Sequence, residues 1–187
     1  MDKKILKVCM LGSFSLEYAG KELVLDRNKA SKTTQLFQLL MFHTEDGGIS
    51  KAAMIEALYG RVEVENKNSS LNNTIFRLRK QLKDIGLPES KYINIQSGMC
   101  CWDENIKVWV DVCEFKRLVE QVRTEKREGD RLQLWLKIWK IYKGEFLPDM
   151  IGENWAAVEN VQCRDDYFQV TTQLCQWLKN NERYEDL

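Results

Sequence analysis

The chain has 187 residues, room for one large or two small domains, and its 28 basic and 28 acidic residues leave no net charge. That balance excludes a protein that is basic throughout, but it leaves room for a local basic patch that binds nucleic acid. No stretch approaches the roughly eighteen consecutive apolar residues of a membrane span, so we expect a cytoplasmic protein without a membrane contact.

The six cysteines and the single histidine, His43, are the residues that a zinc site would need. No two cysteines have the CxxC spacing of zinc ligands, so we expect no metal site. The adjacent pair Cys100 and Cys101 is poorly placed for a structural disulfide, and we expect reduced thiols.

The chain begins with a strand pattern. Residues 5–11 are an apolar run with β-branched members, and residues 14–18 alternate apolar and polar side chains at the period of a half-buried strand. A turn at 19–21 separates them from a further strand at 22–25. The sequence therefore predicts a small antiparallel sheet before any helix.

Three helical patterns follow this sheet. The first covers 31–43, and the second covers 51–59 with Ser50 at the N-cap position. A polar loop at 61–67 leads to the third helix, which the Gly86-Leu87-Pro88 run ends.

After the third helix, the sequence predicts a β-hairpin. Residues 92–95 and 99–102 are short strand patterns on either side of Ser97-Gly98. The order of a sheet, three helices and a hairpin is that of a winged helix, whose last helix enters the major groove of DNA while the hairpin forms the wing.

Residues 66–83, the third helix, hold several basic residues and no acidic one. Leu71, Ile75, Leu78 and Leu82 recur at helical spacing and define one apolar stripe. The opposite side carries Asn73, Phe76, Arg77 and Lys80, flanked by Asn72 and Lys83. Amide, guanidinium and ammonium groups read base edges and bind phosphates. The alternative, taking this helix alone, is an ordinary solvated surface, since basic helix faces are common.

From residue 111 onward the pattern is helical. We expect helices at 111–127, 132–142 and 155–179, with Gly129-Asp130 as a break between the first two. Antiparallel helices of this length joined by short loops suit a tetratricopeptide-like repeat. Residues 183–187 look like the start of another helix, so we expect the helical array to continue past Leu187.

The full chain resembles the Streptomyces antibiotic regulatory protein (SARP) family. In the first half the resemblance rests on Leu11-Gly12 with Phe14, the turn at Gly20, the Leu39-Leu40 helix, the Leu58-Tyr59 pair and Ile75-x-Arg77-Leu78-Arg79-x-x-Leu82. In the second half it rests on Val110-Asp111 with Phe115, and on Tyr142-x-Gly144-x-Phe146-Leu147 followed by Trp155 and Arg164. The second set is the more specific.

The resemblance implies an α+β winged helix of the OmpR type over residues 1–110 and an all-α bacterial transcriptional activator domain over 111–187. It further implies a transcriptional activator that binds double-stranded DNA at direct repeats as a homodimer and contacts RNA polymerase. One departure is the wing, where Gly98 is followed by Met99-Cys100-Cys101-Trp102 and not by a basic residue. We therefore expect the third helix to supply more of the phosphate binding.

The chemistry of each side chain suggests its role on DNA. Paired amide hydrogen bonds suit adenine, and an arginine suits guanine O6 and N7. Long basic side chains at the helix edge suit phosphates, and a lysine at a helix N-terminus can add a phosphate contact. Phe76 can contact a thymine methyl group or pack within the protein. The predicted DNA-binding residues are Asn72 and Asn73 for adenine, Arg77 for guanine, and Arg79, Lys80, Lys83 and Lys51 for phosphate, together with Phe76.

Two other classes of function compete with this hypothesis. The first is a helical-repeat interaction module whose winged helix does not bind DNA, which the uncharged wing favours. The second is an enzyme, but the sequence shows no phosphate-binding glycine loop and no nucleophile with a base. We therefore expect no enzymatic activity and no cofactor.

Overall fold

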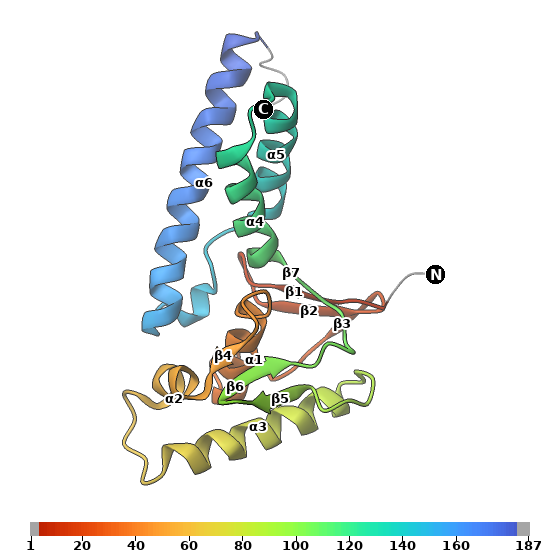
Figure 1. Cartoon of the computed structure of the whole chain (residues 1–187), viewed down its shortest axis with the longest axis vertical. Coiled ribbons are helices and arrows are strands. Elements are labelled where there is room, and N and C mark those ends of the chain that lie inside the picture. Colours follow the sequence, from red (N-terminus) through yellow and green to blue (C-terminus); the bar gives the residue numbers. More distant parts are fainter. Residues whose placement is uncertain (1–3, 183–187) are drawn as a thin grey trace. The chain divides into compact units, whose positions relative to one another are not determined.

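The computed structural model describes residues 4–182, in two compact units (Figure 1). Unit 1 comprises Met1–Cys9 and Phe14–Val110, and unit 2 comprises Met10–Ser13 and Asp111–Leu187. The elements of unit 1 are β1 (Leu6–Cys9), β2 (Ser15–Tyr18), β3 (Lys21–Leu23), α1 (Lys32–Phe42), β4 (Ile49–Ser50), α2 (Lys51–Tyr59), α3 (Lys67–Asp84), β5 (Ile93–Gln96), β6 (Met99–Trp102) and β7 (Val108–Val110). Those of unit 2 are α4 (Asp111–Thr124), α5 (Glu128–Ile141), the short 3-10 helix η1 (Pro148–Met150) and α6 (Asn154–Asn180). The helix expected at 183–187 lies outside the described residues.

The first sheet of unit 1 has the strand order β3-β2-β1-β7. β1 pairs with β2, and β2 with β3, in antiparallel register, as the alternation of residues 14–18 predicts. β7 joins the other edge of β1 in parallel, with Val8 opposite Val110. The sequence did not predict this pairing, because two parallel strands about a hundred residues apart share no turn that would announce them.

The three helices of unit 1 pack against one another, and a second sheet with the order β4-β6-β5 packs beside them. Phe37 of α1 is fully buried between the edges of two other rings, with centroids 6.3 Å from Phe14 and 5.8 Å from Trp102. Edge-to-face contacts at these distances are the favoured geometry of aromatic pairs. The first strands, the first helix and the hairpin therefore share one core.

Gly48 allows β4 to approach the hairpin closely. Its φ is +103°, and a Cβ atom at this position would lie 2.5 Å from the Cys100 carbonyl oxygen and 2.8 Å from the Cys101 Sγ. Both the positive φ and the lack of space require glycine. The Gly47-Gly48 turn after α1 is thus a structural feature of the second sheet.

In unit 2, α4 packs on α5, and both pack on α6. The boundary between α4 and α5 differs from the prediction, because Gly129 lies inside the first turn of α5 and does not break a helix. The break falls at 125–127, where Arg127 is extended and precedes Glu128 and Asp130 in the first turn of α5. Acidic residues at this position interact favourably with the helix dipole, which offsets the cost of a glycine.

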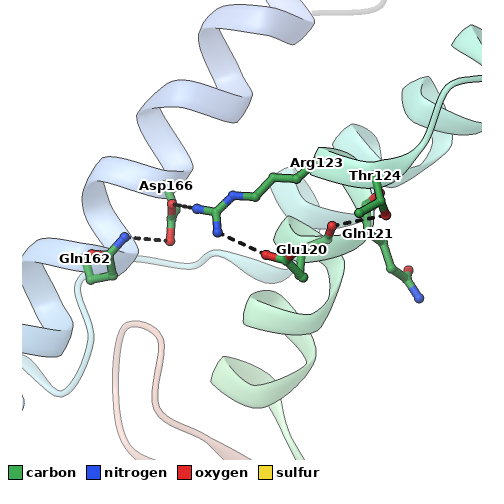
Figure 2. A network of polar contacts seen from close by, with 6 residues as sticks. All are labelled: Glu120, Gln121, Arg123, Thr124, Gln162 and Asp166. Carbon is green, nitrogen blue, oxygen red and sulfur yellow. Dashed lines mark hydrogen bonds and ion pairs between the residues drawn. The ribbon is translucent and has the colours of Figure 1, made fainter.

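A polar network joins α4 to α6 (Figure 2). The Arg123 guanidinium lies 2.9 Å from the Asp166 carboxylate on α6 and 3.1 Å from Glu120 on its own helix. Gln162 donates to the other Asp166 oxygen at 3.1 Å, so both oxygens of this nearly buried carboxylate are bonded. The network thus pairs the Asp166 carboxylate of α6 with α4, and Glu159 of α6 makes a second ion pair with α4, to Lys116 at 2.7 Å.

Residues 10–13 pair with the loop that follows α5. Gly12 donates its N–H to the Glu145 carbonyl at 2.8 Å, and Leu147 donates its N–H to the Met10 carbonyl at 2.9 Å. Gly144 has a φ of +147°, and a Cβ there would lie 3.3 Å from the Gly12 Cα. The positive φ, together with this close approach, favours glycine at position 144 of the Tyr142-x-Gly144-x-Phe146-Leu147 run.

Asp111, the first residue of α4, also holds residues 10–11 in place. Its buried carboxylate accepts the backbone N–H groups of Met10 at 2.8 Å, Leu11 at 2.9 Å and Val112 at 2.7 Å. Burial raises the pKa of the Asp111 carboxyl above its usual value, and the bonds from Leu11 and Met10 partly oppose this rise. The carboxylate therefore ties residues 10–11 to the start of α4.

Candidate nucleic-acid interface

The ends of α3 are set by local signals. Asn66 is the N-cap, and its side-chain oxygen accepts the Ser69 N–H at 3.0 Å. At the other end Gly86 has a φ of +93° and donates to the Lys83 carbonyl, while Leu87 donates to the Leu82 carbonyl. These bonds are those of a glycine-terminated helix. The helix therefore ends where the Gly86-Leu87-Pro88 run predicts.

One side of α3 is buried, as its apolar spacing predicts. Its buried residues are Leu71, Thr74, Ile75, Leu78 and Leu82, and the helix packs on both α1 and α2. The hydroxyl groups of Tyr59 and Thr74 are 2.7 Å apart, which links the last residue of α2 to the middle of α3. This buried pair holds the rotation of α3 about its own axis, and no local sequence pattern predicted it.

The opposite side of α3 presents Asn72, Asn73, Phe76, Arg77 and Lys80, all exposed. Within residues 4–182, the side chains of the two asparagines, Arg77 and Lys80 make no hydrogen bond or ion pair. Their donors and acceptors are therefore available to an external partner. These five of the eight predicted DNA-binding residues lie together on one face.

Arg79 differs from its neighbours because its guanidinium is used inside the protein. Its Nε donates to the Lys91 carbonyl at 3.1 Å, and its Nη2 donates to the Ile93 carbonyl at 2.6 Å. The side chain is only half-exposed and joins α3 to the start of β5. The structure thus gives Arg79 a role in holding the hairpin, while its predicted phosphate contact stays a prediction.

We expect the substitution Arg79→Ala to lower the free energy of unfolding by about 1–2 kcal/mol, because two carbonyl groups lose a charged donor. Thermal unfolding followed by circular dichroism measures the change. Lys80→Ala is the matched control on the next residue and should change stability by no more than about 0.5 kcal/mol. Equal stability of the two variants would contradict the structural role of Arg79.

Lys83 lies at the end of the exposed face and pairs with an acidic residue. Its ammonium group is 2.8 Å from the Glu89 carboxylate, and both side chains are exposed to solvent. The hydrogen bond to Glu89 raises the pKa of Lys83 and lowers the pKa of Glu89. A phosphate would have to compete with Glu89 for this lysine, although an exposed pair of this kind exchanges readily.

Lys51 lies apart from the exposed face of α3, at the start of α2. Its backbone N–H donates to the Gly98 carbonyl at 2.7 Å, and Ser50 caps the Ala53 N–H at 3.1 Å. Two N–H groups of the first turn are thus already bonded, so this helix end offers less to an anion than the sequence predicted. Only the Lys51 side chain remains for a phosphate contact.

The hairpin β5–β6 turns at Ser97 and Gly98, whose φ values are +50° and +79°. Positive φ at both central residues is typical of the tight turns that match strand twist. The strands pair in antiparallel register from Ile93–Trp102 to Gln96–Met99. The exposed turn itself, Ser97 and Gly98, carries no basic side chain.

No protein-family model matches the sequence, and no curated protein matches it. Among solved structures, EmbR of Mycobacterium tuberculosis, in complex with a low-affinity phosphopeptide, has the same fold with a TM-score of 0.70. The two sequences are 14% identical over an alignment that covers 97% of this chain and 47% of the EmbR chain. The likeness establishes a SARP-like fold, a mixed strand-and-helix region followed by helices. The chain spans about half the length of EmbR.

Over residues 4–182, no three His, Cys, Asp or Glu residues gather in a way that would hold a metal ion. No helix in the same range is both long and apolar enough to cross a membrane. Among residues 4–182, no two cysteines form a disulfide bond.

Proposed function

We propose that this protein is a sequence-specific DNA-binding transcriptional regulator of the SARP type. Unit 1 acts as a winged helix with α3 in the major groove, and the hairpin β5–β6 is its wing. The SARP-like fold supports this proposal, and so does the order of the elements in unit 1. An activator role, binding of direct repeats by two copies and a contact with RNA polymerase rest on the sequence resemblance.

The exposed face of α3 is the observation that carries the proposal. It combines two asparagines, an arginine and a lysine whose polar groups have no partner among the described residues. The opposite face is anchored in the core of unit 1 by five buried residues. A rigid helix that presents free amide and basic groups has the chemistry that reads base edges.

Selection of bound duplexes from a random DNA pool tests the proposal. A regulator of this type enriches one sequence, whose affinity falls as salt rises because phosphate contacts release counterions. The spacing of repeats in the enriched duplexes shows whether two copies bind. Recovery of unenriched DNA, or of none, would contradict the proposal.

A helical-repeat interaction module is the second candidate. The wing without basic residues favours it, as do the internal contacts of Arg79 and Lys83. Such a module would show no salt-dependent preference among duplexes in the same selection. The one experiment therefore separates the two functions.

A further inference from the structure

We infer that Phe76 is a specificity-determining residue that contacts the 5-methyl group of a thymine in the major groove. This inference rests on the proposed function, since it assigns a base to one residue of the α3 face. It concerns which sequence is chosen, and not whether DNA is bound.

Phe76 is the starting observation because its ring lies in solvent. It is 69% exposed, the highest value among the large hydrophobic side chains of the described residues. Single exposed apolar residues are common on protein surfaces. Phe76 differs from the other exposed apolar residues in its position, because it lies on the face of α3 that carries the unpartnered polar groups.

The neighbours of Phe76 on the helix surface are the candidate base and phosphate contacts. Residues three and four positions away lie beside it, and these include Asn72, Asn73 and Lys80. The buried residues Ile75 and Leu78 point to the other side of α3. The phenyl ring is thus surrounded by amide and ammonium groups and cannot join the core without rotating the helix.

A helix that enters the major groove brings such a ring against the base edges. Three of the four bases offer only hydrogen-bond donors and acceptors there as distinctive groups, whereas thymine adds a methyl group. A phenyl ring has no polar atom that could form hydrogen bonds with the other three bases. The free-energy cost of placing it against a base edge is therefore smallest at the thymine methyl group. Asn73, one turn earlier, suits adenine. We therefore expect an A·T-containing step under this part of α3.

The test uses the duplex selected from the random pool and removes one methyl group at a time by replacing single thymines with uracil. For the wild-type protein, uracil at one position should weaken binding about fourfold, the value of one buried methyl group. Phe76→Ala should bind the thymine duplex about tenfold more weakly than wild type, which is the lower end of the range expected when a buried phenylalanine side chain is lost. The same variant should bind the thymine and uracil duplexes equally.

Two further variants serve as controls, and circular dichroism verifies that all of them fold. Phe168→Ala removes another exposed phenylalanine, 60% exposed on α6, and should keep the fourfold preference for thymine. Phe76→Leu keeps an apolar group at the position and should retain part of that preference. Fluorescence anisotropy with labelled duplexes gives each dissociation constant.

The results also separate this inference from the proposed function. Failure to select any duplex would overturn both. Selective, salt-dependent binding that is insensitive to every uracil would overturn the role of Phe76 alone. The same holds if Phe76→Ala keeps the sensitivity of the wild type at the same position.

Discussion

Replacing Asp111 with alanine should lower the free energy of unfolding by about 3 kcal/mol, because three buried N–H groups lose their acceptor at about 1 kcal/mol or more each. The donors are the backbone groups of Met10, Leu11 and Val112. Asp111 is 3% exposed, so water cannot easily replace the carboxylate. Urea unfolding followed by circular dichroism and tryptophan fluorescence measures the loss.

Asp111→Asn is the conservative control, since it keeps the shape of the side chain and one acceptor oxygen. We expect a smaller loss of about 1 kcal/mol for the donor left unpaired. A loss as large as that of Asp111→Ala would show that the charge matters more than the hydrogen bonds.

The pH dependence of stability gives a second readout on the same residue. Because burial raises the pKa of Asp111, the folded protein binds its proton more tightly than the unfolded chain does. The part of the stability that comes from this pKa shift is therefore fully present below the usual pKa and is lost as the pH rises through the raised value, whereas the hydrogen bonds of Asp111 remain. Asp111→Asn should remove this part of the pH profile, and an unchanged profile would contradict the assignment.

Arg77→Ala should weaken binding to the selected duplex by about 1–3 kcal/mol, or roughly five- to 150-fold, if Arg77 pairs with a guanine. The side chain is exposed on α3, and the structure gives it no bond inside the described residues. Its removal should therefore leave stability unchanged while relaxing the base preference at one position. Anisotropy titrations against duplexes altered at each base pair measure both effects.

Lys80→Ala provides the contrast of a phosphate contact. It should weaken binding to all duplexes alike and lower the slope of log K against log salt by about one. Lys137→Ala removes another exposed lysine, on α5, and should change neither quantity. If Arg77→Ala and Lys80→Ala both bound like wild type, α3 would not be the DNA-reading helix.

The features of unit 1 that follow from local sequence agree with the structure. The period of Leu71, Ile75, Leu78 and Leu82 indicated the buried side of α3, and these four residues are buried. The glycine turn at Gly98 indicated the hairpin, because tight turns need residues that accept a positive φ. Periodicity and turn chemistry involve neighbouring residues, so a single sequence is enough to find them.

Contacts between distant residues were not predictable in this way. Arg79 looked like a phosphate ligand from its place on the helix, and only the structure shows the carbonyl groups of Lys91 and Ile93 beside it. The parallel pairing of β1 with β7 has no local signal either. Asp111 appeared only as part of a family resemblance, and its bonds to residues a hundred positions earlier supply the physical reason.

Residues 10–13 belong to unit 2, although the residues before and after them belong to unit 1. This arrangement limits how the two halves of such a protein can be recombined. The chain passes between the units at Cys9–Met10, at Ser13–Phe14 and again at Val110–Asp111. A gene fusion that joined residues 111–187 to another DNA-reading module would leave Met10–Ser13 behind. The Asp111 carboxylate would then lose two donors, and the Leu147 N–H would lose its acceptor. Module shuffling at residue 110 would therefore be selected against unless the new partner supplied an equivalent segment.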